Sequence, residues 1–127
     1  MTLALQDTVR QAGDVIMDYF RRGFEVEKKA DDSPVTRADQ DAEQLILKAL
    51  ARLAPELPVI AEEEAAAGRL PEIGEAFFLV DALDGTREFI NKRREFTVNI
   101  GLVENKTPVL GIVYAPALDE LYYAWGA

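Results

Sequence analysis

The chain has 127 residues, 49% of them apolar, which is enough to bury one hydrophobic core and falls within the usual size of a single domain. Its 23 acidic and 14 basic residues leave a net charge of -9, which disfavours binding to nucleic acid polymers and to anionic lipid surfaces. Because cysteine and histidine are both absent, disulfides, thiolate metal sites and imidazole catalysis are excluded.

The first predicted element is an amphipathic helix near the N-terminus. Apolar residues recur there every three to four positions, at Leu5, Val9, Ala12, Ile16 and Phe20. Thr2 can cap this helix and Gly23 can end it. Charged residues interrupt residues 1–20, so neither a signal peptide nor a transmembrane segment is expected, and a soluble cytoplasmic protein is the default expectation.

A second helix is predicted after a polar, turn-rich stretch at residues 28–34. Thr36 and Asp39 have the spacing of a capping box, so the helix is expected to begin near Arg37 and to stop before Pro55. Its apolar positions are Ala42, Leu45, Ile46, Ala49, Leu50 and Leu53.

The rest of the chain has the pattern of strands. Residues 59–60 and 77–80 are short apolar runs that each lead into acidic residues, and residues 96–102 alternate between apolar and polar or small positions. Asn105 and Lys106 predict a turn, residues 109–114 a hairpin partner and residues 121–124 a further strand. The predicted fold class is therefore α+β, with two helices packed on a mainly antiparallel sheet and residues 1–127 forming one domain.

The segment Asp81-Ala82-Leu83-Asp84-Gly85-Thr86 carries the strongest chemical signal. Two carboxylates three residues apart, leaving a buried strand, can hold hard divalent cations such as Mg²⁺. Gly85 would let the backbone approach a ligand, and a short helix after Thr86 would offer amide donors to phosphate. Taken alone, the pattern is equally typical of ordinary turn and cap residues.

Two other acidic patterns do not fit this segment. A calcium-binding EF-hand loop needs glycine at its sixth position, whereas Gly85 is fifth from Asp81. The phosphatase pattern with a nucleophilic aspartate needs that residue two positions before Asp84, where this chain has Ala82.

The wider sequence resembles the inositol monophosphatase superfamily. The segments that carry the resemblance are Ser33–Asp39, Ile60–Glu63, Asp81–Phe89, Glu95–Gly101 and Gly111–Pro116, in the family's order and approximate spacing. Residues 81–89 and 95–100 look most like the CysQ branch, the 3'(2'),5'-bisphosphate nucleotidases. The resemblance implies the N-terminal half of a layered αβαβα sugar-phosphatase-like fold.

The resemblance also implies a site that uses two or three Mg²⁺ ions when complete. Glu62, Asp81, the Leu83 carbonyl oxygen and Asp84 would be metal ligands, and Glu62 also counts among the catalytic residues. Asp39 and Thr86 would pair to activate water, while the Gly85 and Thr86 amides would hold phosphate oxygens. In the family, metal-bound water attacks phosphorus without a covalent intermediate.

The chain departs from the family's pattern in two ways. Ala82 replaces the usual proline, a change expected to loosen the loop without removing a ligand. The family also has a C-terminal α/β domain with a Trp-Asp segment that supplies a further metal-ligating aspartate and much of the substrate pocket, and this domain is expected to be absent here.

The expected function is Mg²⁺-dependent hydrolysis of a small phosphorylated substrate, with adenosine 3',5'-bisphosphate preferred. One alternative is a phosphatase for inositol or sugar phosphates. Another is a non-catalytic fragment that binds metal or a partner without turnover. Half of a larger fold would expose apolar surface, so a homodimer is one expected partner state.

Overall fold

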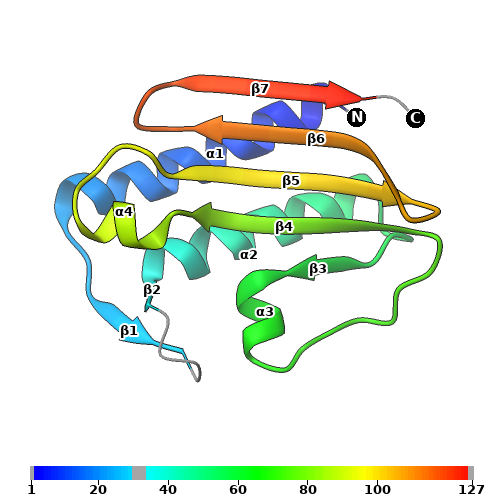
Figure 1. The fold of residues 1–127 in the computed structure, drawn as a ribbon, viewed down its shortest axis with the longest axis horizontal. Coiled ribbons are helices and arrows are strands. Elements are labelled where there is room, and N and C mark those ends of the chain that lie inside the picture. The colour runs from blue at the N-terminus through cyan, green and yellow to red at the C-terminus, as the bar shows by residue number, and fades with distance from the viewer. Residues whose placement is uncertain (1, 30–33, 126–127) are drawn as a thin grey trace.

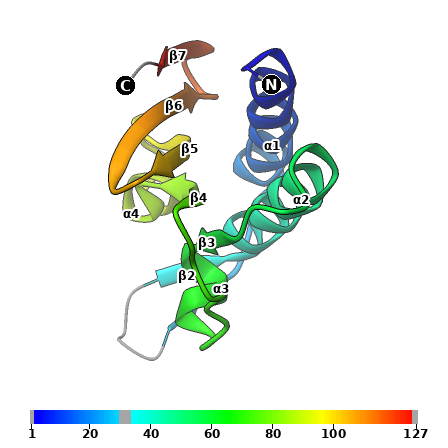
Figure 2. The same cartoon turned by 90° about the vertical axis from the view of Figure 1, so that its right-hand side faces the viewer.

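The computed structural model describes residues 2–29 and 34–125, and in it a five-stranded sheet is covered on one face by two long helices. Figure 1 shows the sheet in front of helices α1 and α2, and Figure 2 shows these helices together on one side of it. The α+β class, with two helices on a mainly antiparallel sheet, is therefore confirmed.

Both long helices occupy the predicted segments. Helix α1 spans Thr2–Arg22, so Thr2 belongs to the helix rather than preceding it, and Gly23 follows with a φ of 108°. Helix α2 spans Arg37–Leu53, and the predicted capping box is present, with Thr36 as the N-cap and Asp39 at the third helical position. In the part of the chain that is described, no helix has the length and apolarity needed to cross a membrane.

Two short strands replace part of the polar stretch that was expected to be only turn-rich. Strand β1 spans Val26–Lys28 and pairs antiparallel with strand β2, Pro34–Thr36, at the entrance to α2. The predicted turn residues 30–33 lie outside the described residues.

The main sheet has the order β3-β4-β5-β6-β7. Strand β3 (Val59–Ala61) runs parallel to β4 (Ala76–Asp84), and the remaining neighbours, β5 (Thr97–Glu104), β6 (Thr107–Ala115) and β7 (Glu120–Trp125), are antiparallel. Two five-residue helices, α3 (Glu62–Ala66) and α4 (Thr86–Ile90), follow β3 and β4 directly. The β5–β6 hairpin turns at Asn105 and Lys106 as predicted, both with positive φ.

The core lies between the helices and the inner face of the sheet. From α1 and α2 it takes Leu5, Val9, Ala12, Ile16, Ala42, Ile46 and Leu50, and from the sheet it takes Phe78, Val80, Val98, Ile100 and Ile112. The strand residues alternate because only every second side chain faces the helices.

Helix α1 approaches the sheet closely at Gly13. A Cβ atom on Gly13 would lie 2.5 Å from the ring of Tyr114, which is buried and donates a hydrogen bond to Asp119. Gly13→Ala is therefore expected to lower the free energy of unfolding by about 1–2 kcal/mol, as overpacking does. Urea denaturation measures the change. The matched control is Gly74→Ala, where the added methyl group meets nothing within 4 Å and stability should stay within about 0.5 kcal/mol.

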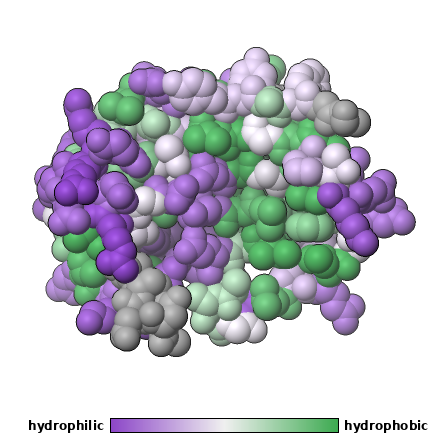
Figure 3. All heavy atoms as spheres, in the orientation of Figure 1, coloured by the Kyte–Doolittle hydropathy of each residue, from purple (hydrophilic) through white to green (hydrophobic). Residues whose placement is uncertain are grey.

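The outer face of the sheet is apolar and, among the described residues, carries no helix. Figure 3 shows apolar residues gathered over the strands on this face. Leu79 and Val113 are exposed there, and Gly101 and Gly111 pair across β5 and β6. A hollow of about 400 Å³ lies over these residues.

Not all of the aromatic residues near the C-terminus pack into the sheet. Tyr114 is buried, but Tyr122, Tyr123 and Trp125 are exposed, Trp125 by 74%. They lie on or near the edge strand β7, where few neighbouring side chains are available to cover them.

Candidate active site

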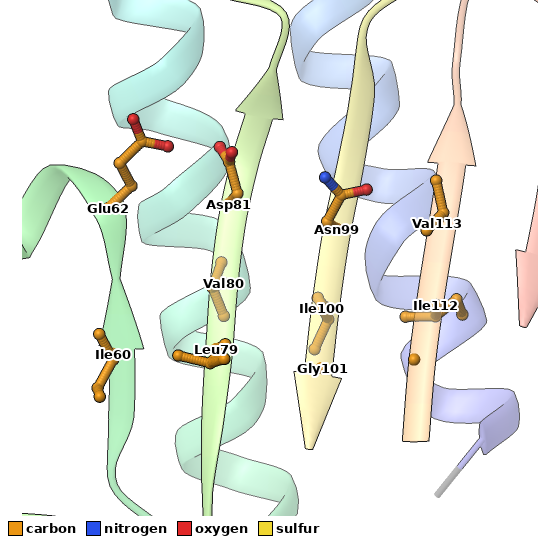
Figure 4. Close-up of a pocket in the computed structure, with 11 residues that line it drawn as sticks. Ile60, Glu62, Leu79, Val80, Asp81, Asn99, Ile100, Gly101, Ile112 and Val113 are labelled. Carbon is orange, nitrogen blue, oxygen red and sulfur yellow. The ribbon is translucent and has the colours of Figure 1, made fainter. Parts of the chain in front are cut away.

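The candidate site lies where β3 and β4 end. These strands are parallel neighbours in which Ala61 aligns with Val80, so the next residues, Glu62 and Asp81, emerge side by side at the same edge. Figure 4 shows their two carboxylate groups close together, with Asn99 of β5 on the far side of Asp81. The parallel pairing thus brings together two acidic segments that are about twenty residues apart in the sequence.

A bulge places Asp84 on the same face as Asp81. In a regular strand, residues three apart point to opposite faces. Here Asp81 pairs with Asn99 and Asp84 with Thr97, so β4 contains one more residue than β5 between these pairs. Asn99 also donates a hydrogen bond from Nδ2 to Asp84 Oδ2, over 3.2 Å. The sequence interpretation of residues 81–84 as a loop is therefore wrong in detail, because the strand continues through a bulge to Asp84.

The turn into α4 depends on Gly85. Its φ of 91° lies in the left-handed region, and a Cβ atom there would come within 3.2 Å of the Glu95 carbonyl oxygen. This turn brings Thr86 against helix α2, where Thr86 Oγ1 donates a hydrogen bond to Asp39 Oδ1 over 2.9 Å. Thr86 Oγ1 also lies 3.3 Å from the Leu83 carbonyl oxygen.

Asp39 therefore has two structural roles. Its Oδ2 accepts hydrogen bonds from the backbone N–H and the hydroxyl of Thr36, which caps α2, while its Oδ1 accepts from Thr86. Burial raises the pKa of Asp39, although these hydrogen bonds act in the opposite direction. The carboxylate is held in place and is more basic than an exposed aspartate.

Lys29 bridges the acids at the start of α3. Its ammonium nitrogen lies 2.7 Å from Glu63 Oε1 and 3.1 Å from Glu62 Oε1. Burial alone would lower the pKa of Lys29, but the hydrogen bonds to Glu63 and Glu62 outweigh it and raise the pKa. Lys29 belongs to the polar stretch of residues 28–34, and its contacts with two acids bring a positive charge to the edge of the site.

A cavity of about 250 Å³ joins these elements. Its walls are formed by Lys29, Glu62, Asp81, Leu83, Asp84, Gly85, Thr86, Arg87 and Glu88. Glu62 and Asp81 also border the larger hollow on the outer sheet face. Thus all the candidate ligand and phosphate-binding residues line one cavity, with Asp39 behind it, bonded to Thr86.

Comparison with known proteins agrees with this arrangement. The Inositol monophosphatase family matches residues 1–127, the whole chain. The chain belongs to the inositol monophosphatase family. Among curated members it is 49% identical over 117 residues to the 3'(2'),5'-bisphosphate nucleotidase CysQ of Salmonella typhimurium, and 44% identical over 117 residues to that of Escherichia coli K12.

Solved structures of family members have the same fold. The extragenic suppressor protein SuhB of Bartonella henselae superposes with a TM-score of 0.86 at 28% identity, covering 98% of this chain and 48% of SuhB. CysQ of Bacteroides thetaiotaomicron superposes with a TM-score of 0.73 at 37% identity, covering 98% of this chain and 45% of that protein. The Salmonella match covers 91% of this chain and 48% of the nucleotidase. The chain therefore spans about half the length of the relatives it matches.

The charges of this family member's site match the needs of a hard cation. Burial first, then the neighbouring Glu62 carboxylate and the charge of Asp84, raise the pKa of Asp81 to about 8. Carboxylates crowded in this way bind a divalent cation more readily, because the ion removes their mutual repulsion. The donors are all oxygen atoms, which suits Mg²⁺.

The ligand set is nevertheless incomplete within residues 2–29 and 34–125. No three acidic side chains in that part of the chain lie close enough together to hold a metal ion. Glu62 and Asp81 face each other, but Asp84 is turned toward Asn99. The site fits Mg²⁺ in its chemistry and needs additional ligands or a rearrangement to enclose the ion.

The sequence analysis missed one buried acid of this site. Glu43 was not singled out in the sequence, but it is a helix residue only 1% exposed. Its carboxylate accepts the backbone N–H groups of Glu63 and Glu64. The available signal was its position four residues after Asp39, which puts both acids on one side of a helix.

Proposed function

We propose that the chain is the N-terminal, metal-binding half of a Mg²⁺-dependent phosphomonoesterase, with a 3'(2'),5'-bisphosphate nucleotide as its preferred substrate. The observation that carries the proposal is the convergence of Glu62, Asp81, Asp84 and the Asp39–Thr86 pair around one cavity. The preference for adenosine 3',5'-bisphosphate is supported by the CysQ relatives, which are named 3'(2'),5'-bisphosphate nucleotidases.

The ligand assignment follows the family resemblance and is supported by the single cavity that these residues line. Glu62 and Asp81 would hold one ion together with the Leu83 carbonyl oxygen, and Asp84 would bind a second ion after releasing Asn99. Bound Mg²⁺ would supply charge neutralisation at the phosphoryl group and lower the pKa of a water molecule.

The Asp39–Thr86 pair would orient the attacking water and accept its proton. Thr86 Oγ1 already donates to Asp39, so it can pass its own proton to the carboxylate as it takes one from water. The raised pKa of Asp39 suits it to hold that proton during the reaction. Backbone amides at Gly85 and Thr86, at the start of α4, would bind phosphate oxygens.

The remaining ligands would come from the half that the relatives possess and this chain does not match. Its relatives are about twice as long, and in the described residues no three acids gather around one point. We therefore propose that full turnover requires a C-terminal domain that adds an acidic ligand and most of the substrate pocket.

Two alternatives give different results in the same assay. An inositol or sugar phosphate phosphatase would use the same metal-binding residues and prefer inositol 1-phosphate. This alternative is supported by the structural similarity to the inositol monophosphatase of Anabaena. A non-catalytic metal-binding domain would bind Mg²⁺ and release no phosphate.

The test measures phosphate release from adenosine 3',5'-bisphosphate and from inositol 1-phosphate, with and without Mg²⁺. In a chain extended to the length of its relatives, we expect Mg²⁺-dependent release that is faster with the nucleotide. Thr86→Val should lower kcat by about 10²–10⁴-fold because it removes the hydroxyl that contacts Asp39. Thr86→Ser keeps the hydroxyl and is the matched control, with activity close to that of the wild type.

The other outcomes distinguish the alternatives. Preference for inositol 1-phosphate would favour the second phosphatase class. Mg²⁺ binding without any release would favour the non-catalytic domain or show that the C-terminal half is required. Release that is independent of Mg²⁺, or unchanged in Thr86→Val, would contradict the proposed mechanism.

A further inference from the structure

Glu43 is a fully buried carboxylate that connects two elements of the site. It lies in α2, and its side chain reaches the start of α3. One oxygen accepts the Glu63 N–H over 2.8 Å and the other accepts the Glu64 N–H over 3.0 Å. Burying a carboxylate is costly unless it is hydrogen-bonded, so both oxygens are used to offset that cost.

Helix α3 has little else to hold it in place. Its N-cap is Ala61, which has no side-chain hydrogen bond to offer, and none of its five residues is buried. The first N–H groups of a helix have no partner within the helix and need one from elsewhere. Glu43 is thus the cap of α3, supplied from a different helix.

The residues that Glu43 holds directly follow Glu62. With the Glu63 and Glu64 amides fixed, the backbone of Glu62 can move little, and its carboxylate stays beside Asp81. Lys29 adds a contact to the Glu62 and Glu63 side chains, but it does not reach the backbone of α3. Of the Lys29 and Glu43 side chains, only that of Glu43 is hydrogen-bonded to backbone amides of α3.

One turn of helix α2 therefore contacts both segments that carry the candidate ligands, the one with Asp84 and the one with Glu62. Asp39 bonds to Thr86, which follows Asp84, and Glu43, four residues later on the same face, bonds to the segment that follows Glu62. Four residues of α-helix rise by about 6 Å, and a hydrogen-bonded helical turn is stiff. Helix α2 thus adds a second connection between the Glu62 and Asp84 segments, beside the β3–β4 pairing.

We infer that Glu43 is a positioning residue, which holds Glu62 at the distance from Asp81 that a shared Mg²⁺ ion requires. This inference rests on the proposed metal site. It assigns to Glu43 no contact with metal or substrate, since the carboxylate is occupied by the two amides. Burial raises the pKa of Glu43 to about 7, a further sign that the group is kept inside at an electrostatic cost.

The experiment uses Glu43→Gln in the full chain with two measurements. The glutamine has the same size, but it offers only one acceptor oxygen, so one of the two amides loses its partner. Amide hydrogen exchange of Glu63 and Glu64 in metal-free protein should become at least tenfold faster. The Mg²⁺ dissociation constant, measured by calorimetry, should rise by about 10–100-fold, as for other residues that orient metal ligands.

Two control variants separate positioning from general destabilisation. Asp41→Asn changes an acid in the same helix that bonds to Tyr19 and not to α3, so both measurements should stay at wild-type values. Gly13→Ala lowers stability at a distant contact and should leave Mg²⁺ affinity unchanged.

Each outcome decides a separate point. Unchanged exchange at Glu63 and Glu64 in Glu43→Gln overturns the inference whether or not Mg²⁺ binds. Unchanged Mg²⁺ affinity in that variant also overturns it. A wild-type chain that binds no Mg²⁺ would contradict the proposed function, while faster exchange in the variant would still show that Glu43 anchors α3.

Discussion

Replacing Asp81 by asparagine is expected to abolish Mg²⁺ binding and, at the same time, to stabilise the metal-free protein. Asp81 lies beside Glu62 and lines both cavities, so its loss removes the central ligand of the proposed site. Without metal, however, burial disfavours its charge, and the charges of Glu62 and Asp84 repel it. Asparagine removes that repulsion while keeping the shape of the side chain.

The raised pKa of Asp81 determines whether Asp81→Asn stabilises the protein and over which pH range it does so. The carboxyl group has a pKa of about 8 in the folded protein, against 3.8 for an unperturbed aspartate. Below pH 4 it is protonated in both folded and unfolded states and has no effect. Between pH 4 and pH 8 the unfolded chain releases this proton more easily, so the folded state loses stability as pH rises. The stability gained by Asp81→Asn, relative to wild type, should therefore increase between pH 4 and pH 8.

Thermal denaturation with and without Mg²⁺, at pH 5 and pH 8, measures both effects. We expect a gain of about 1–2 kcal/mol for metal-free Asp81→Asn at pH 8, less than the full pKa shift implies because water screens the partly exposed group. Wild-type protein should gain stability with Mg²⁺ and the variant should not. Glu72→Gln removes a charge from an exposed loop and serves as the control. A variant that is less stable than wild type at pH 8 without metal would contradict the predicted repulsion.

Phe89→Ala is expected to cause the largest loss of stability of any substitution considered. Phe89 is fully buried in α4, and its ring packs against Phe20, Phe24 and Phe96 with centroid distances of 5.7, 4.5 and 5.2 Å. Removing a buried phenylalanine side chain costs about 3–5 kcal/mol, through lost burial and the cavity left behind. The cavity would lie directly beneath the turn that carries Gly85 and Thr86.

Urea unfolding followed by tryptophan fluorescence and circular dichroism measures this loss. Tyr123→Ala removes an exposed aromatic side chain and should change stability by less than about 0.5 kcal/mol. Because α4 is only five residues long, Phe89→Ala should also weaken the Thr86–Asp39 contact and reduce Mg²⁺-dependent phosphate release more than its stability loss alone explains. A loss below 1 kcal/mol would show that the aromatic cluster is not part of the core.

Local sequence patterns predicted the secondary structure well. The two helices, the capping box at Thr36 and Asp39 and the β5–β6 hairpin all lie where they were expected. Each depends on residues close together in the sequence, through helical periodicity, strand alternation or turn preference. Local patterns do not decide burial where it depends on distant neighbours, as for Tyr122, Tyr123 and Trp125, which are exposed on the edge strand β7.

In the candidate site, too, some residues were recognisable from the sequence and others only from the structure. Asp81, Asp84 and Glu62 stood out in the sequence as acids following strands, and the family resemblance supplied their expected roles. Lys29 and Glu43 did not stand out, because a lysine in a polar stretch and a glutamate in a helix are ordinary surface residues in most sequences.

The sequence by itself determined the chemical repertoire of this protein: carboxylate and hydroxyl groups, no imidazole or thiol, and a strongly acidic charge. It also determined the local elements, because helix caps, turns and alternating strands are encoded by neighbouring residues. Only the tertiary structure decided which acids meet. The parallel β3–β4 pairing brings Glu62 to Asp81, the bulge turns Asp84 to the same face, and α2 joins both segments through Asp39 and Glu43. These contacts link residues 15 to 47 positions apart, and such pairs form only when the chain has packed.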